Sequence, residues 1–405
     1  MDIAITEIGG TSGDIESLPF LEAARQFKLE SAANDVIFLH LTLVPFIRAA
    51  KELKTKPSQH SVATLRGIGI EPDLLVCRSE VPLEEDHFKK LSMFCNVPTR
   101  YVVEELDVKN SIYEVPLELA RQELDLKVLE LLNMEPGTLD LDSYRQWLDG
   151  VLHPQKECTV AVVGKYIKHQ DAYKSIYEAL HHAGIKHSAR VKFLLVEAED
   201  LESSDAEKIL GPADAILVPG GFGERGVRGK VKAVEYARTH KVPFLGICLG
   251  MQCAVIEFAR DVLGWKDANS TEFNEMTTHP VIDLMLEQRS ITDKGGTMRL
   301  GAYPCVFDPE SLAAKIYGKT EISERHRHRY EFNSKYRKDL EDAGLSIAGT
   351  NPESGLVEVV ELKDHPYFIG CQYHPEFKSR PQDPHPLFAG LIAAALKGHE
   401  HAKAQ

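Results

Sequence analysis

A cysteine stands between two glycines, each two residues away, in the segment Gly246-Ile247-Cys248-Leu249-Gly250. The apolar run before it, VPFLGIC, is typical of a strand, and the residues after it are helix-like. Flanking glycines allow a sharp strand-to-helix turn that holds a nucleophile at a helix N-terminus, where the thiolate is favoured over the thiol. We therefore predict an exposed, reactive sulfur at Cys248. Other cysteines follow patterns typical of buried core positions: Cys77, Cys253, Cys305 and Cys371.

A cysteine nucleophile in acyl transfer needs a general base and a group that orients this base. The sequence offers Tyr373-His374-Pro375-Glu376 directly after the apolar run FIGCQ. Pro375 favours an extended conformation at His374, and Glu376 is close enough to fix one ring nitrogen. A single histidine at a strand end is also typical of a structural role. Together with Cys248, however, the segment predicts a Cys-His-Glu triad.

A glycine-rich segment, DAILVPGGFGERG, contains the third part that such a site needs. Gly220, Gly221 and Gly223 follow an apolar run, and a loop this rich in glycine can turn its N–H groups toward a developing oxyanion. The amide of Leu249 would add a further donor. Taken alone, the same segment is equally typical of a flexible turn.

Two series of alternating strand-like and helix-like segments must position these residues, which indicates parallel sheets covered by helices. Between them, residues 137–156 lose the strand pattern, and we predict a linker there, with domains at 1–136 and 157–401. The helix DAYKSIYEALHHAG is predicted to end at Gly184. The predicted strands are residues 3–8, 36–44, 73–77 and 99–103 in the first half, and 158–166, 190–197, 214–221, 242–248, 355–362 and 366–374 in the second.

The composition places limits on the class of protein. The chain has 405 residues, and 43% hydrophobic and 27% charged content is ordinary for a globular protein of two or three domains. With 47 basic and 61 acidic residues the net charge is −14, which argues against general binding to nucleic acid. No apolar run reaches the roughly 18 residues of a membrane span. Seven scattered cysteines without a C-x-x-C pair favour a reducing, cytoplasmic location.

The segments PGGFGERG, GICLGMQ and YHPE resemble the class I glutamine amidotransferase domain. LGICLGMQ, ANSTEF, GGTMRLGA and ERHRHRYEFN resemble its form in the CTP synthase family. Such domains hydrolyse glutamine through a glutamyl thioester and pass ammonia to a synthetase. The resemblance implies that Cys248 is the nucleophile, His374 the base and Glu376 its partner. It also implies that Gly221 and Leu249 lie at the oxyanion. The residues implied for contacts with glutamine are Gly221, Leu249, Gly250, Met251, Gln252, Glu272 and Arg329.

The run ERHRHRY could instead be a nucleic-acid patch or a histidine metal site. A row of basic side chains is most often a solvated face, and acidic residues flank this one. The resemblance favours a buried Arg329 that binds the α-carboxylate of glutamine, for which a bidentate guanidinium is well suited.

The first half contains two weaker patterns. Glu7 ends the first predicted strand beside Gly9 and Gly10, where a nucleotide-bound Mg²⁺ would lie. Further on, residues 54–60 concentrate positive charge and hydroxyl groups in a predicted loop that could cradle a triphosphate. Taken alone, the two patterns are equally consistent with a simple turn and a surface loop.

EIGGTSGDIESLPFLEA, HLTLVP, KTKPSQHSV and FCNVP resemble the synthetase domain of the CTP synthase family, which aminates UTP using ATP. The resemblance implies a truncated P-loop-type (Rossmann-like) parallel-sheet domain, with Glu7 as the Mg²⁺ ligand and Asp107 and Val108 beside the adenine of ATP. It further implies GTP activation, CTP inhibition and a homotetramer. The residues implied for UTP or CTP are Asp14, Ile15, Glu16, Lys54, Thr55, Lys56, Pro57, Ser58, Gln59 and Lys90.

One departure from the family concerns the P-loop that should come more than a hundred residues before the EIGG segment. No Walker A motif occurs in the 405 residues: the Gly164-Lys165 and Gly229-Lys230 pairs lack the hydroxyl, and Gly318-Lys319-Thr320 has Ala313 in place of the leading glycine. We expect that the first residues of a CTP synthase are missing, and that an apolar sheet edge at residues 2–8 causes poor solubility.

Two alternatives stay open. The chain could act only as a glutaminase or as a non-synthesising regulatory subunit. It could also be an amidase-like hydrolase unrelated to nucleotides, which KTKPSQH and GDIES disfavour.

Overall fold

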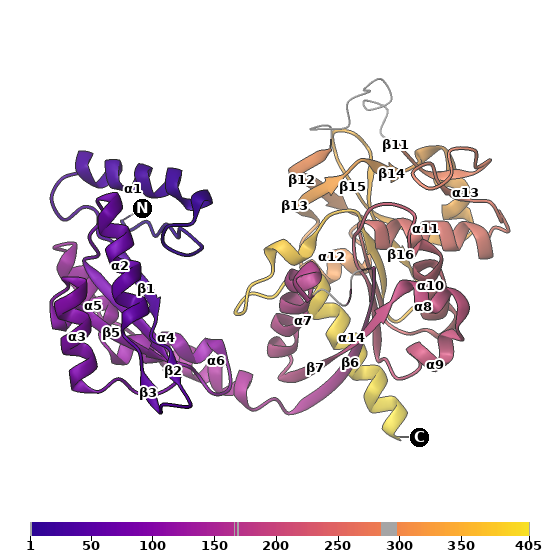
Figure 1. Ribbon diagram of the computed structural model, residues 1–405. Coiled ribbons are helices and arrows are strands. Elements are labelled where there is room, and N and C mark those ends of the chain that lie inside the picture. The colour runs from indigo at the N-terminus through magenta and orange to yellow at the C-terminus, as the bar shows by residue number, and fades with distance from the viewer. Residues whose placement is uncertain (1, 166, 168–169, 285–297, 405) are drawn as a thin grey trace. The chain divides into compact units, whose positions relative to one another are not determined.

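The computed structural model describes residues 2–165, 167, 170–284 and 298–404, with side chains as far as Gly398. Part of the GGTMRLGA segment, residues 295–297, lies outside the described residues. The chain divides into two compact units, Met1–Leu152 and His153–Gln405 (Figure 1). In the part of the chain that is described, no helix is long and apolar enough to cross a membrane.

The first unit is built on a parallel sheet with the order β1-β4-β5. The strands predicted at residues 36–44 and 73–77 are thereby confirmed. The third lies later than predicted, at Val102–Leu106, because Thr99–Tyr101 form a 3-10 helix. The central strand β4 is buried at five of its six residues because both neighbours and the covering helices shield it. The elements are α1 (Leu18–Glu30), β1 (Leu39–Leu43), β2 (Phe46–Ile47), β3 (Glu52–Leu53), α2 (Lys56–Ile68), β4 (Leu74–Ser79), α3 (Glu85–Cys95), β5 (Val102–Leu106), α4 (Val115–Arg121), α5 (Leu124–Leu131) and α6 (Asp142–Leu152).

The prediction of a strand at residues 3–8 is wrong. These residues form no regular structure, and the side chain of Ile5 is 94% exposed. Alternating apolar residues make a strand only where a neighbour accepts the backbone hydrogen bonds, and no described strand pairs with this segment. The described edge strands of this sheet are β1 and β5, and β1 exposes apolar side chains.

The segment predicted as a linker contains a helix, α6. It belongs to the first unit, where the ring of Trp147 lies 5.1 Å from that of Tyr113 in an edge-to-face contact. Tyr144 also donates a hydrogen bond to the Tyr113 carbonyl oxygen at 2.8 Å. These contacts explain why a segment without strand periodicity is still ordered.

The second unit contains a nine-stranded sheet with the order β13-β12-β15-β16-β17-β9-β8-β6-β7. The strands from β17 to β7 are parallel, and those from β16 to β13 extend the sheet antiparallel. All six strands predicted in this half are present. The large sheet comprises β6 (Lys156–Gly164), β7 (Ala189–Glu197), β8 (Ala215–Val218), β9 (Phe244–Ile247), β12 (Arg299–Phe307), β13 (Glu321–His328), β15 (Leu345–Thr350), β16 (Val357–Leu362) and β17 (Phe368–Cys371), and a small one comprises β10 (Asn269–Ser270), β11 (Pro280–Leu284) and β14 (Tyr330–Phe332).

Helices cover both faces of the large sheet, and each face has its own apolar core. The strands β8 and β9 are buried at every residue, as expected for central parallel strands between two helix layers. One layer consists of α8 (Ala198–Ser203), α9 (Ala206–Leu210), α10 (Val227–His240) and α11 (Leu249–Asp261), and the other of α7 (Lys174–Lys186), α12 (Leu312–Tyr317) and α14 (Pro386–Ala404) (Figure 1). The short helix α13 (Arg337–Asp342) follows β14.

The helix predicted to end at Gly184 continues to Lys186. Gly184 serves close packing instead, because a Cβ atom there would lie 2.7 Å from the carbonyl oxygen of Ala189.

Candidate active site

The turn between β9 and α11 has the geometry of a nucleophile elbow. Cys248 is its apex, with φ 52° and ψ −104°, a combination that non-glycine residues rarely adopt. A Cβ atom on Gly250 would lie 2.0 Å from the carbonyl oxygen of Val218, and one on Gly246 would lie 2.7 Å from the carbonyl carbon of Gly250. Both glycines are therefore required for the helix to start this close to the strands.

The prediction that the sulfur of Cys248 is exposed is wrong, because this residue is only 3% exposed. The reason is that His374 and the loop that contains Gly220, Gly221 and Gly223, here called the glycine loop, cover the side chain of Cys248. A Cβ atom on Gly220 would be 3.5 Å from Cβ of Cys248 and 3.0 Å from Cε1 of His374. Gly220 thus lies between the two side chains, and any larger residue would separate or displace them.

His374 is held by Glu376 as predicted from their spacing. The distance from Nδ1 of His374 to Oε1 of Glu376 is 2.7 Å, and both side chains are largely buried. Nε2 of His374 is buried and has no hydrogen-bond partner among the described residues. Burial lowers the pKa of His374, but the neighbouring Cys248 and Glu376 raise it more, to about 10. The imidazole is therefore a proton donor at neutral pH.

Two lysines donate hydrogen bonds to backbone carbonyl oxygens of the glycine loop and of Pro219 before it. Nζ of Lys165 donates to the carbonyl oxygens of Phe222, at 2.7 Å, and Gly223. Nζ of Lys230, which is fully buried, donates to the carbonyl oxygen of Pro219 at 2.8 Å. The loop is consequently fixed, and it is not the flexible turn that its glycines also allowed.

Burial lowers the pKa of Lys230 to about 8. Sequence reasoning missed both lysines, because it considered them only as parts of incomplete Walker A motifs. No local pattern in the sequence marks a buried lysine that binds a distant loop.

Two of the residues implied for glutamine binding, Leu249 and Glu272, contact this loop. A Cβ atom on Gly221 would lie 3.4 Å from Cδ2 of Leu249, and Oε1 of Glu272 accepts a hydrogen bond from the N–H of Gly223 at 2.7 Å. The side chain of Met251 is buried and packs against Gly370. Since Gly250 has no side chain and Met251 faces the core, contacts of these two with glutamine would come from the backbone.

Arg329 is half-buried, not buried as predicted. It lies between β13 and β14, where the alternation of the strand ends. Next to it, the carbonyl oxygen of Tyr330 accepts a hydrogen bond from Nε2 of Gln252 at 2.9 Å. Arg329 is thereby adjacent in sequence to a residue that contacts α11, and its Nε atom is buried.

The ERHRHRY run is divided between two faces by strand β13. Glu324, His326 and His328 point inward, whereas Arg325 and Arg327 are exposed. Nδ1 of His326 lies 2.9 Å from Nε2 of His328. The pKa values of the two histidines are lowered, chiefly by burial, to about 2 and about 3, so both are neutral. The run is therefore neither a continuous basic patch nor a fully solvated face.

A buried ion pair lies beside these histidines. An Nη atom of Arg299 is 2.7 Å from Oε1 of Glu358, and His326 is 3.5 Å from the other carboxylate oxygen. Burial raises the pKa of Glu358 to about 7, an effect that Arg299 opposes. Within the described residues, no group of three His, Cys, Asp or Glu side chains could hold a metal ion.

The nucleotide residues implied in the first unit are mostly exposed. Glu7 lies in the irregular N-terminal segment, and Asp14, Ile15 and Glu16 follow it in exposed positions. The carboxylate of Asp14 accepts a hydrogen bond from the N–H of Thr11 at 2.8 Å. Glu7 therefore has no surrounding ligand set, and the described residues alone do not form a magnesium site.

The segment from Lys54 to His60 is not a loop as predicted, because α2 begins at Lys56 with Pro57 in its first turn. Lys54 forms an ion pair with Glu52, and Nε2 of Gln59 donates to the hydroxyl of Thr55 at 3.1 Å. A helix N-terminus suits phosphate binding. Thr55 and Ser58 are buried, whereas Lys56 and Lys90 are exposed.

Asp107 and Val108 follow strand β5. Nε of Arg78 lies 2.7 Å from a carboxylate oxygen of Asp107, and Val108 is half-buried. Both residues are at the carboxyl end of a parallel strand, which is the usual edge for a ligand in such sheets.

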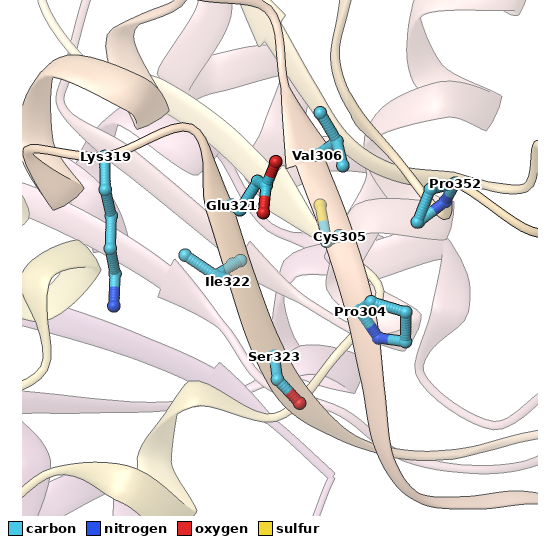
Figure 2. A pocket seen from close by; sticks show the side chains of 8 residues that line it. All are labelled: Pro304, Cys305, Val306, Lys319, Glu321, Ile322, Ser323 and Pro352. Atoms are coloured by element: carbon cyan, nitrogen blue, oxygen red, sulfur yellow. The ribbon is translucent and has the colours of Figure 1, made fainter.

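A shallow cavity of about 450 Å³ lies elsewhere, against strands β12 and β13. Figure 2 shows the side chains that line it, and none of them belongs to the candidate site. They are Pro304, Cys305, Val306, Lys319, Glu321, Ile322, Ser323 and Pro352.

Comparisons with known proteins agree with this geometry. The family model for the CTP synthase N-terminus matches residues 1–134, and that for class I glutamine amidotransferases matches residues 168–394. The CTP synthase of Fibrobacter succinogenes is 62% identical over 398 residues, which cover 98% of this chain and 70% of the relative. This chain belongs to the CTP synthase family.

Other relatives extend the comparison across distant organisms. The CTP synthase of Methanococcus maripaludis is 55% identical over 402 residues, covering 98% of this chain and 75% of that protein. A solved structure of the Trypanosoma brucei CTPS glutaminase domain with bound acivicin has a TM-score of 0.56 and 43% identity. It covers 59% of this chain and 94% of that chain. The α/β architecture with a class I glutamine amidotransferase domain is therefore that of the CTP synthase family.

Proposed function

We propose that the second unit hydrolyses glutamine at Cys248 with His374 and Glu376, and that the ammonia serves the amination of UTP to CTP. The observation that carries this proposal is the arrangement of Cys248 at a strained elbow, with Gly220 against both Cys248 and the His374 ring that Glu376 holds. Membership in the CTP synthase family supplies the substrate class.

The reaction follows from the positions of the side chains. The sulfur of Cys248 attacks the amide carbon of the glutamine side chain, and the N–H groups of Gly221 and Leu249 bind the oxyanion. The protonated His374 gives its proton to the departing nitrogen, which leaves as ammonia, and a glutamyl thioester remains. Water, deprotonated by His374, then releases glutamate and restores the cysteine.

Glutamine recognition is assigned to the residues around the loop. We infer that Arg329 binds the α-carboxylate of glutamine and that Glu272 contributes on the opposite side. Gly250, Met251 and Gln252 would contribute through the backbone at the start of α11.

For the first unit we propose the nucleotide reaction of the family. ATP phosphorylates O4 of UTP, and ammonia then displaces phosphate to give CTP. The proposed UTP and CTP contacts are the exposed lysines at the start of α2 and on α3 together with the Asp14 to Glu16 turn, and Asp107 and Val108 would border ATP. Magnesium would be bound chiefly by the nucleotide, with Glu7 as its protein ligand, and supplies charge neutralisation of the phosphates.

The remaining family properties are proposals of the same kind. We infer GTP activation, inhibition by CTP, a homotetramer and a cytoplasmic location. The division into a synthetase domain at 1–136, a linker and an amidotransferase domain at 157–401 is likewise proposed.

The test uses the purified chain in two assays. Glutamate release from glutamine should occur in the wild type and fall by at least about 10³-fold in Cys248→Ala. Persistent hydrolysis in this variant would contradict the assignment of the nucleophile. The second assay supplies UTP, ATP, Mg²⁺ and ammonium chloride, which bypasses Cys248, so the substitution Cys248→Ala should leave any CTP formation unchanged. Glutamate without CTP would instead support the glutaminase-only alternative.

A further inference from the structure

A buried glutamine contacts the sulfur of Cys248. Gln372 is completely buried directly after β17, and its Nε2 lies 3.6 Å from Sγ of Cys248. Neither residue can move easily. The N–H of Cys248 donates to the carbonyl oxygen of Cys371 at 2.7 Å, and the N–H of Gln372 donates to that of Glu358 at 2.8 Å.

The orientation of the Gln372 amide follows from a chain of hydrogen bonds. The carbonyl oxygen of Tyr330 can only accept, so the group of Gln252 that faces it at 2.9 Å is the NH₂ group. The same NH₂ group lies 3.2 Å from Gln372, whose facing atom must then be Oε1. The NH₂ group of Gln372 is consequently the one turned toward the sulfur. The carbonyl oxygen of Tyr330 thereby determines that the NH₂ group of Gln372, and not its oxygen, faces Sγ of Cys248.

An amide N–H can only donate, so the sulfur must accept. A thiolate is a much better acceptor than a thiol, and hydrogen bonds to charged groups are the stronger ones. The protonated His374 that neighbours Cys248 favours the same charge state. When the thioester breaks down, sulfur leaves as a thiolate again, so a donor at this position assists that step as well.

We propose that Gln372 is a further catalytic residue, which donates an N–H to the Cys248 thiolate and stabilises it both in the free enzyme and as the leaving group of the thioester. This inference rests on the proposed role of Cys248 as nucleophile. Sequence reasoning missed Gln372, because a glutamine two residues before a histidine has no chemical signature of its own.

The test measures the alkylation of Cys248 by iodoacetamide as a function of pH, with the modified peptide identified by mass. Gln372→Met removes the donor and keeps a side chain of similar length, and Gln372→Glu replaces the donor with an oxygen. We expect the pH midpoint of alkylation to rise by about one unit in Gln372→Met, a tenfold change, and further in Gln372→Glu. Glutamyl-enzyme should also accumulate in both variants during turnover. Gln382→Met, at an exposed position of the same unit, should match the wild type.

The alternative is that Gln372 only fills space. In that case the variants would melt at lower temperature while the alkylation midpoint remained at the wild-type value, and this result would overturn the proposal. If Gln372→Met fails to fold, the nearly isosteric Gln372→Glu still decides the question. Glutaminase activity that survives in Cys248→Ala would instead refute the proposed function, so the two failures are distinguishable.

Discussion

The charge state of His374 depends on two neighbours that act against burial. Burial alone would make the imidazole neutral, but Cys248 and Glu376 raise its pKa from the usual 6.5 to about 10. At neutral pH the resting site therefore contains an imidazolium beside Cys248. In the proposed reaction, this imidazolium donates its proton to the departing amide nitrogen of glutamine.

Replacing Glu376 with glutamine keeps the size of the side chain and removes its charge. We expect glutaminase kcat in Glu376→Gln to fall by on the order of 10²-fold or more, because the imidazole loses its orientation and the stabilisation of its charged form. The pKa of His374 should fall from about 10 toward 6.5. Histidine-labelled NMR titration measures this pKa, and a value that stays near 10 would contradict the assigned cause.

The raised pKa also makes stability depend on pH. Because the value in the folded state exceeds that of an ordinary histidine, the stabilisation is complete below about pH 6.5 and is lost as the pH rises to about 10. The melting temperature of the wild type should therefore fall over this interval by more than that of Glu376→Gln. If the melting temperatures of the two proteins fell equally over this pH interval, the raised pKa of His374 would not contribute to the pH dependence of stability.

At the scale of elements, helix α10 positions the glycine loop through the hydrogen bond from Lys230 to the carbonyl oxygen of Pro219. Lys230→Met retains the aliphatic part of the side chain but removes the donor to Pro219. We expect glutaminase kcat to fall by about 10- to 100-fold, because the oxyanion donors lose their fixed position. The melting temperature should change little, since the desolvation cost of a buried charge is removed at the same time.

Lys232 provides the matched control for this prediction. It lies on the same helix, and its Nζ also donates to a backbone carbonyl, that of Glu202 at 2.8 Å, but in an exposed place. Lys232→Met should keep wild-type kcat. Equal losses in both variants would mean that the helix, and not the loop contact, is responsible.

The exposed apolar strand expected at residues 2–8 lies instead at β1, one of the two described edge strands of the first sheet. Leu39, Leu41 and Leu43 on β1 are 44%, 59% and 57% exposed. Such an edge promotes association between copies of a chain. We expect Leu41→Lys to reduce the concentration-dependent growth of particle size in light scattering. Unchanged growth would place the association surface elsewhere.

At the scale of the whole molecule, the sequence predicts those features that local patterns determine. Apolar runs in the sequence predict six of the nine strands in the large sheet of the second unit, including β8 and β9, and two local glycines predict the elbow. The sequence analysis does not predict β12, β13 or β15. The strand at residues 3–8 was predicted wrongly, since a pattern does not show whether a pairing neighbour exists. The burial of Cys248 and the roles of Lys230 and Gln372 depend on contacts between distant segments, which the order of residues alone does not reveal.

Hydrolysis of glutamine through a covalent bond to Cys248 requires a glutamyl-enzyme during turnover. Acid quenching during turnover with glutamine, followed by peptide mass analysis, detects this intermediate. We expect the added mass of a glutamyl group on the peptide that contains Cys248, and a larger fraction of modified peptide in Gln372→Met. A glutamyl group on any other cysteine, or glutamate release with no adduct in either protein, would contradict it.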